Sequence, residues 1–125
     1  MSPSSNPAGQ SAEQRLAEYM HVELVAVSPA LPVAEALRRM DGGGASCVVA
    51  VEDGRPVGIL TDTDVLRLQA QADLAGLTVA QVMTTPVVLA AEGGRLADAV
   101  SLMSERRIRH LPLVGPDGRL QGVLG

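Results

Sequence analysis

An internal duplication dominates this 125-residue sequence. Residues 16 to 60 recur about 63 positions later, at residues 79 to 124, with the spacing of the apolar positions preserved. The Asp-Gly-Arg turn at 53 to 55 returns at 117 to 119, so the second copy carries one extra residue before this turn. A unit of about 60 residues is marginal alone, so the two copies are expected to share a core in one pseudo-symmetric domain.

Composition and charge argue against one class of partner. Phe and Trp are absent and Tyr19 is the only aromatic residue, so the core must be aliphatic. The net charge is −4, and the chain has neither a basic run nor clustered aromatic rings. Nucleic-acid binding needs cations that neutralise phosphates and rings that stack on bases. The sequence therefore predicts no nucleic-acid partner.

The cellular compartment is predicted from what the sequence lacks. Cys47 is the single cysteine, so no internal disulfide can form. Neither a signal peptide nor an apolar run of about 18 residues is present, which favours a cytoplasmic protein without a membrane partner. Residues 1–12, rich in Ser, Pro, Asn and Gly, are predicted to be a disordered lead-in.

Apolar periodicity and turn residues predict the same order of elements in both copies. The first copy is predicted to contain a helix at 16–20, a strand at 24–28, a helix at 33–40, strands at 47–51 and 57–60 around a turn at 52–55, and a helix at 62–72. The second is predicted to contain a helix at 79–83, a strand at 87–89, a helix at 96–104 and strands at 110–114 and 120–124. The three glycines at 42–44 follow a helix, so they are interpreted as a helix stop rather than a phosphate cradle.

Three segments repeat in register and resemble one known family. They are Met-Thr-Thr-Pro at 83–86, Ala-Val-Ser-Leu-Met at 99–103 and Arg-His-Leu-Pro-Leu-Val at 109–114. Together they resemble the cystathionine β-synthase (CBS) domain, and the duplication resembles a tandem CBS pair, or Bateman module. The repeats would span 13–76 and 77–125.

The resemblance implies a fold and a function. The fold is α/β, with two three-stranded halves that carry helices and pack sheet to sheet about a pseudo-twofold axis. The two clefts so formed would bind an adenine nucleotide or a related adenosyl compound, such as AMP, ADP, ATP or S-adenosylmethionine. Such modules usually report ligand binding to an attached effector domain, often dimerise, require no cofactor and are generally not enzymes.

The segment Gly-Ile-Leu-Thr-Asp-Thr-Asp at 58–64 matches the family's binding motif, which places Ile59, Thr61 and Asp64 at a nucleotide. A hydroxyl and a helix N-terminus both suit a phosphate, and a carboxylate can accept hydrogen bonds from two ribose hydroxyls. The same Thr-x-x-Asp spacing is also close to a capping box, which would satisfy backbone amides with no ligand present. Both roles remain open, and they can coexist.

Further candidates for ligand contact come from the resemblance alone. Ser46 and Cys47 lead into a strand where the family places contacts to the adenine edge, and Val27 and Ser28 would line the same cleft. The alternative is a small-residue strand start with a buried cysteine beside an ordinary core strand.

Arg109 and His110 occupy the equivalent entrance in the second copy and would offer positive charge to phosphates. The alternative is a solvated basic face, because Arg106 and Arg107 lie close by. A metal role for His110 is not predicted, since no second ligand stands at suitable spacing.

The two copies differ at their ends. Residues 122–125 align with 58–61, so Gly125 stands where the first copy has Thr61, and no Asp follows. We therefore expect one complete nucleotide site. The closing helix of the second copy is also absent, and the hypothesis is that the sequence is a fragment of a longer protein.

Two functions are compatible with these observations. The first is a regulatory module that senses an adenine nucleotide and signals to an effector domain, as a homodimer. The second is a ligand-free dimerisation scaffold in which the Thr-x-x-Asp motif serves only as a helix cap. Catalysis is not predicted, because no Ser-His-Asp set, metal cluster or paired catalytic carboxylates can be placed together.

Overall fold

The computed structural model describes residues 25–71 and 73–125. The chain divides into two compact units, and the boundary between them falls after Val87. The predicted helix at 16–20 and the lead-in at 1–12 lie outside the described residues.

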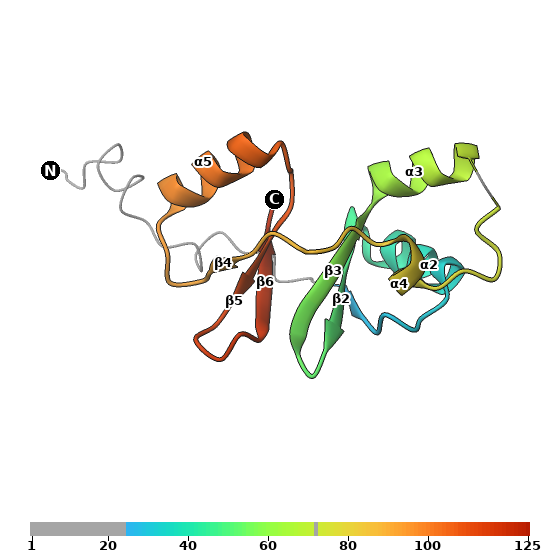
Figure 1. Cartoon of the computed structure of the whole chain (residues 1–125), viewed down its shortest axis with the longest axis horizontal. Coiled ribbons are helices and arrows are strands. Elements are labelled where there is room, and N and C mark those ends of the chain that lie inside the picture. The colour runs from blue at the N-terminus through green and yellow to red at the C-terminus, as the bar shows by residue number, and fades with distance from the viewer. Residues whose placement is uncertain (1–24, 72) are drawn as a thin grey trace, which may run out of the picture. The chain divides into compact units, whose positions relative to one another are not determined.

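The first unit is built on a three-stranded sheet with the order β1-β2-β3 (Figure 1). The strands are β1 (Ala26–Val27), β2 (Cys47–Glu52) and β3 (Arg55–Thr61). β1 pairs parallel with β2, and β2 pairs antiparallel with β3. The predicted hairpin is confirmed, and its turn needs two residues with positive φ, which Asp53 (φ 53) and Gly54 (φ 80) supply.

Three helices accompany this sheet: α2 (Val33–Gly43), α3 (Asp62–Gln71) and α4 (Val79–Val82). α2 buries Val33, Ala36 and Met40, which is the predicted apolar stripe. The helix runs through two of the glycines expected to stop it. Gly44 ends it, because its φ of 66 turns the chain left-handed and its N–H donates to the carbonyls of Met40 and Asp41.

α4 belongs to the first unit, although the sequence repeat places it at the start of the second copy. Val79 is fully buried in the first unit's apolar cluster. Its N–H donates to the carbonyl of Leu31 at 2.8 Å, and the Val33 N–H donates to the carbonyl of Leu77 at 2.9 Å. These bonds tie the start of α4 to the start of α2. The compact unit and the repeat in the sequence therefore have different boundaries.

The segment after α4 continues along the same sheet. Thr84 forms an antiparallel bridge with Ile59, and the Thr85 hydroxyl donates to the carbonyl of Val57 at 3.1 Å. β3 thus has a neighbour on the side away from β2. The apolar cluster of this unit consists of Val27, Ala36, Met40, Val48, Ala50, Leu60, Val65 and Val79.

The second unit repeats this plan with β4 (Ala90–Ala91), α5 (Leu96–Arg106), β5 (Leu111–Val114) and β6 (Leu120–Leu124). The strand order is β4-β5-β6, again parallel and then antiparallel. Its own cluster contains Ala99, Leu111, Leu113 and Leu124. Two three-stranded sheets with helices confirm the predicted fold class.

The ladders repeat the register of the duplication. Val48 pairs with Leu60 in the first unit, and Leu111 pairs with Leu124 in the second. The irregularity between Ala50 and Val51 recurs between Leu113 and Val114. The one extra residue of the second copy lies beyond this point, in the connection between β5 and β6. Its length is absorbed by the loop rather than by the paired strands.

One predicted strand is misplaced. The apolar run at 87–89 was expected to be a strand, whereas the paired residues are Ala90 and Ala91. The run is where the chain passes from one compact unit to the other, so it has no backbone ladder partner. Apolar β-branched residues favour a strand only where a partner strand is present.

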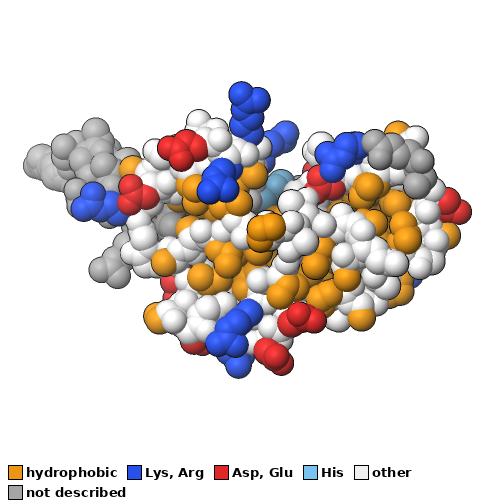
Figure 2. Space-filling view, viewed as in Figure 1, with side chains coloured by type: hydrophobic (Ala, Val, Ile, Leu, Met, Phe, Trp, Pro, Cys, Tyr) orange, Lys and Arg blue, Asp and Glu red, His pale blue; other side chains and the backbone are white. Residues whose placement is uncertain are grey.

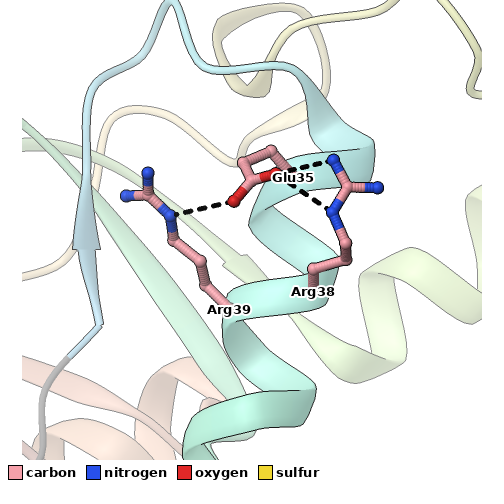
Figure 3. Close-up of polar contacts among 3 residues, drawn as sticks. All are labelled: Glu35, Arg38 and Arg39. Carbon is pink, nitrogen blue, oxygen red and sulfur yellow. Dashed lines mark hydrogen bonds and ion pairs between the residues drawn. The ribbon is translucent and has the colours of Figure 1, made fainter.

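The exposed face of α2 carries an ion-pair cluster (Figure 3). Arg38 contacts Glu35 through Nη2 at 2.6 Å, and Arg39 contacts the other carboxylate oxygen through Nε at 3.5 Å. The hydrogen bond and charge of Arg38, followed by those of Arg39, hold the pKa of Glu35 below its usual value. Among the described residues, no helix combines the length and the apolar character of a membrane span.

Candidate functional site

The predicted site residues of the first copy meet where β3 passes into α3. Thr61 ends β3 and lies opposite Cys47, the first residue of β2. The N–H of Asp62 donates to the carbonyl of Ser46 at 2.9 Å. Ser46, Cys47, Thr61 and the first turn of α3 therefore form one junction, called the β3–α3 junction below.

Thr61 and Asp64 bind each other's backbone amides across this junction. The Asp64 N–H donates to Thr61 Oγ1 at 3.1 Å, and the Thr61 N–H donates to Asp64 Oδ2 at 3.1 Å. This reciprocal pair is the arrangement of a capping box, with Thr61 as the N-cap. The structural role predicted from the spacing is confirmed.

The same pair keeps unused hydrogen-bonding capacity. The Thr61 hydroxyl accepts one bond and still has its own proton to donate. Asp64 Oδ2 accepts from Thr61 and Oδ1 accepts from Arg67 Nη2 at 3.0 Å, and each oxygen has a second lone pair. The junction can therefore cap α3 and accept hydrogen bonds from two ligand hydroxyls.

The backbone amides of α3's first turn are not available to an anion. Those of Asp62, Thr63 and Asp64 donate to the Ser46 carbonyl, to Asp62 Oδ1 and to Thr61 Oγ1, respectively. The expectation that the helix N-terminus itself suits a phosphate is therefore not met in this arrangement. A phosphate at this junction would need side-chain donors.

Cys47 is buried at 7% exposure. Burial, with a smaller contribution from the charge of Asp62, raises the pKa of the Cys47 thiol to about 11. The thiol is thus protonated at neutral pH and behaves as a small apolar side chain. It is not a nucleophile in this state, since only the thiolate is nucleophilic.

The other first-copy candidates lie elsewhere on the sheet. Ile59 is half-buried, pairing with Val49 on one side and Thr84 on the other. Val27 packs into the apolar cluster and pairs with Ala50, three positions along β2 from Cys47. Ser28 Oγ accepts the N–H of Ala30 at 3.1 Å, which closes a local turn. The structure does not bring Val27 and Ser28 to the β3–α3 junction, and their ligand role stays a prediction.

Arg109 and His110 belong to the second unit and directly precede β5. Arg109 is exposed and His110 is half-buried. Arg106 ends α5, and Arg107 adopts a left-handed φ of 55 at its C-cap. Figure 2 shows both blue and red side chains over the region of α5, so the charges on this surface are mixed. Among the described residues, no group of His, Cys, Asp or Glu could hold a metal ion.

Sequence reasoning missed two features of the first unit. Arg67 pairs with Asp64, and the signal was its i,i+3 spacing within a predicted helix. Thr84 and Thr85 bind β3, and no local signal could have placed them there because their partners lie far away in the sequence.

Both units share the element order β-α-β-β, which α3 and α4 follow in the first unit, so the fold defines a tandem-repeat α/β protein. The CBS domain family model matches residues 16–71 and again residues 79–125. The chain belongs to the CBS domain family and carries two CBS repeats.

The chain matches most of the length of one curated relative and only a small part of another. The CBS domain-containing protein YhcV of Bacillus subtilis is 35% identical over 98 residues, or 78% of this chain and 70% of that protein. An inosine-5′-monophosphate dehydrogenase of Rhodopirellula baltica is 34% identical over 113 residues, or 89% of this chain but only 20% of the enzyme. Three curated relatives, YhcV among them, are matched over 56 to 70% of their own lengths.

The fold is also similar to that of a solved CBS-pair protein. The crystal structure of CBSX2 in complex with AMP has a TM-score of 0.74 and 28% sequence identity, and the match covers 88% of each chain. CBSX2 is a CBS-pair protein from Arabidopsis thaliana.

Proposed function

We propose that this chain is a regulatory module that binds an adenine nucleotide or a related adenosyl compound at the β3–α3 junction. Asp64 accepts hydrogen bonds from the ribose hydroxyls, and the Thr61 hydroxyl donates to the ligand. Ser46, Cys47 and Ile59 border the base, and Val27 and Ser28 line the ligand cleft away from the junction. The module itself is non-catalytic.

One observation carries the proposal. The Thr61–Asp64 pair is joined by two reciprocal bonds and still has the Thr61 hydroxyl proton and one lone pair on each Asp64 oxygen unused. A ligand hydroxyl can thus bind without breaking the helix cap. The complex of CBSX2 with AMP, a CBS-pair relative at 28% identity, supports an adenine nucleotide as the ligand.

We further propose that the module acts within the cytoplasm as a homodimer and reports to an effector domain. The match to one fifth of inosine-5′-monophosphate dehydrogenase supports attachment to a larger protein. Arg109 and His110 are proposed to bind anionic groups in the second unit. Light scattering tests the dimer, and a species with the monomer's mass at all concentrations would contradict it.

Calorimetry with AMP, ADP, ATP, NAD and S-adenosylmethionine tests the ligand and the site. Asp64→Ala is expected to weaken binding by about tenfold or more, because a charge-assisted hydrogen bond is lost. It also removes a cap and should lower stability by about 0.5 to 2 kcal/mol.

The matched control is Gln81→Ala, which removes a partner of the Thr78–Gln81 capping box on α4. It should cost similar stability and leave ligand binding unchanged. The proposal fails if the wild-type chain binds none of the five compounds. The site assignment fails if Asp64→Ala binds as tightly as the wild type, which would leave the ligand-free scaffold as the function.

A further inference from the structure

Arg67 is the cation of the β3–α3 junction. It lies one helical turn after Asp64 on α3, and its Nη2 atom contacts Asp64 Oδ1 at 3.0 Å. The contact means that the guanidinium extends back toward the N-terminal end of α3. The Arg67 side chain is 59% exposed and that of Asp64 is 15% exposed, so the arginine covers a largely buried carboxylate from the solvent side.

The junction needs a cation if its ligand carries phosphate. Asp62 and Asp64 both lie in the first turn of α3, and their negative charges oppose an approaching anion. The amides of that turn are already used within the chain. The Thr61 hydroxyl alone would offer a phosphate one neutral donor.

The other described arginines of the first unit are engaged at different places. Arg38 and Arg39 pair with Glu35 on α2. Arg55 lies opposite Glu52 at the hairpin turn, at the far end of β3 from Thr61. Within the described residues of this unit, Arg67 is therefore the arginine that contacts a predicted ligand-binding side chain.

Arg67 also has donors to spare. A guanidinium presents five N–H groups in a planar fork, and the contact with Asp64 is made through Nη2. The remaining donors can bind phosphate oxygens while this contact persists, since arginine recognises phosphate through paired, charge-assisted hydrogen bonds.

We infer that Arg67 binds the phosphate of the ligand while it remains paired with Asp64, and thereby makes the site prefer a nucleotide over its nucleoside. This inference rests on the proposed function. It assigns the ribose to Asp64 and the phosphate to Arg67 and the Thr61 hydroxyl. The Asp64–Arg67 ion pair thus joins the side chain that binds the ribose to one that binds the phosphate.

AMP and adenosine are the probes, because they share base and ribose and differ by the phosphate. Calorimetry is performed on the wild type, Arg67→Gln and Arg67→Lys. Arg67→Gln is expected to weaken AMP binding by about tenfold and to change adenosine binding by less than about twofold. Arg67→Lys keeps the charge but loses the fork, so its AMP affinity should fall between the other two.

The matched control is Arg38→Gln, which removes an exposed i,i+3 ion pair and the same charge from α2 (Figure 3). It should leave the ratio of the two affinities unchanged. An equal loss of AMP and adenosine binding in Arg67→Gln would overturn the inference, since it would mean that Arg67 only supports Asp64. Unchanged affinities of Arg67→Gln for both AMP and adenosine would overturn it too. A wild type that binds neither compound would instead remove the proposed function, and the inference with it.

Discussion

At the residue scale, Gly58 lies in close contact with the side chain of Met83. A Cβ atom at this position would overlap the Met83 thioether, with Met83 Cγ at 2.7 Å and Cε at 2.9 Å. Gly58 is buried in the middle of β3, three residues before Thr61. The glycine of the binding motif thus has a packing role that the motif alone did not reveal.

Gly58→Ala is expected to lower the free energy of unfolding by about 1 to 3 kcal/mol, because the added methyl group overpacks a closed contact. Urea unfolding measures the loss. The double variant Gly58→Ala, Met83→Ala should cost less than the sum of the single variants, since removing the thioether makes room. Additive costs would show that the methyl group added at position 58 does not contact the Met83 side chain.

Cys47 makes stability depend on pH in the alkaline range. Its folded-state pKa is raised from 9.0 to about 11, so the unfolded chain loses its thiol proton first as pH rises. The stabilising effect is complete below the unfolded pKa and is lost as pH rises through the folded one. Between about pH 8 and about pH 10 this contributes a loss of about 1 kcal/mol.

Urea unfolding of the wild type and of Cys47→Ala at both pH values checks this expectation. The wild type should lose about 1 kcal/mol more than the variant over that interval, whatever the variant's absolute stability. Parallel pH profiles for the two proteins would mean that the thiol ionises equally well in the folded state.

At the scale of the element, the C-terminal end of α2 is set by one of the three glycines at 42–44. Gly42 and Gly43 have helical geometry, and only Gly44 turns left-handed. Because open space surrounds Gly42 and Gly44, backbone conformation alone decides the effect of a substitution at either position. The sequence predicted a stop within the run, but not which glycine provides it.

Gly44→Ala is expected to lower the free energy of unfolding by about 1 kcal/mol, since alanine is strained at positive φ. Gly42→Ala, two residues earlier, is the control and should raise it by about 0.5 kcal/mol, because alanine favours the helix. Thermal denaturation followed by circular dichroism measures both. Two shifts of the same sign would contradict the assigned helix end.

The strands differ in how well local sequence predicts them. The β2–β3 hairpin was predicted with its turn, because a short β-branched run and the Asp-Gly pair are local signals. β4 was misplaced, since its position depends on which residues meet β5. Pairing across a parallel ladder is a long-range contact, and a single sequence does not report it.

At the scale of the whole molecule, the compact units do not follow the copies in the sequence. α4 opens the second copy but is buried with the first, through Val79 and the bonds of Leu31 and Leu77. Substitution of Val79 should therefore weaken the unit that contains β2 and β3.

Val79→Ala is expected to cost about 1 to 3 kcal/mol, because it leaves a cavity in the first cluster. Native-state hydrogen exchange should report reduced protection in β2 and β3. Leu113→Ala, in the second cluster, is the control and should reduce protection in β5 and β6 instead. Loss of protection in β5 and β6 for Val79→Ala would contradict the assignment of α4.

The sequence by itself determined the duplication, the β-α-β-β order of each half and the Thr61–Asp64 cap, because periodicity, turn residues and capping are local signals. Tertiary structure alone decided which half buries α4, that β4 lies after the apolar run rather than within it, and which side chain lies against Gly58. It also joined Ser46 to the first turn of α3. These outcomes depend on backbone pairing and close packing between segments distant in the chain, where each side chain's place is set by partners that its own neighbourhood does not contain.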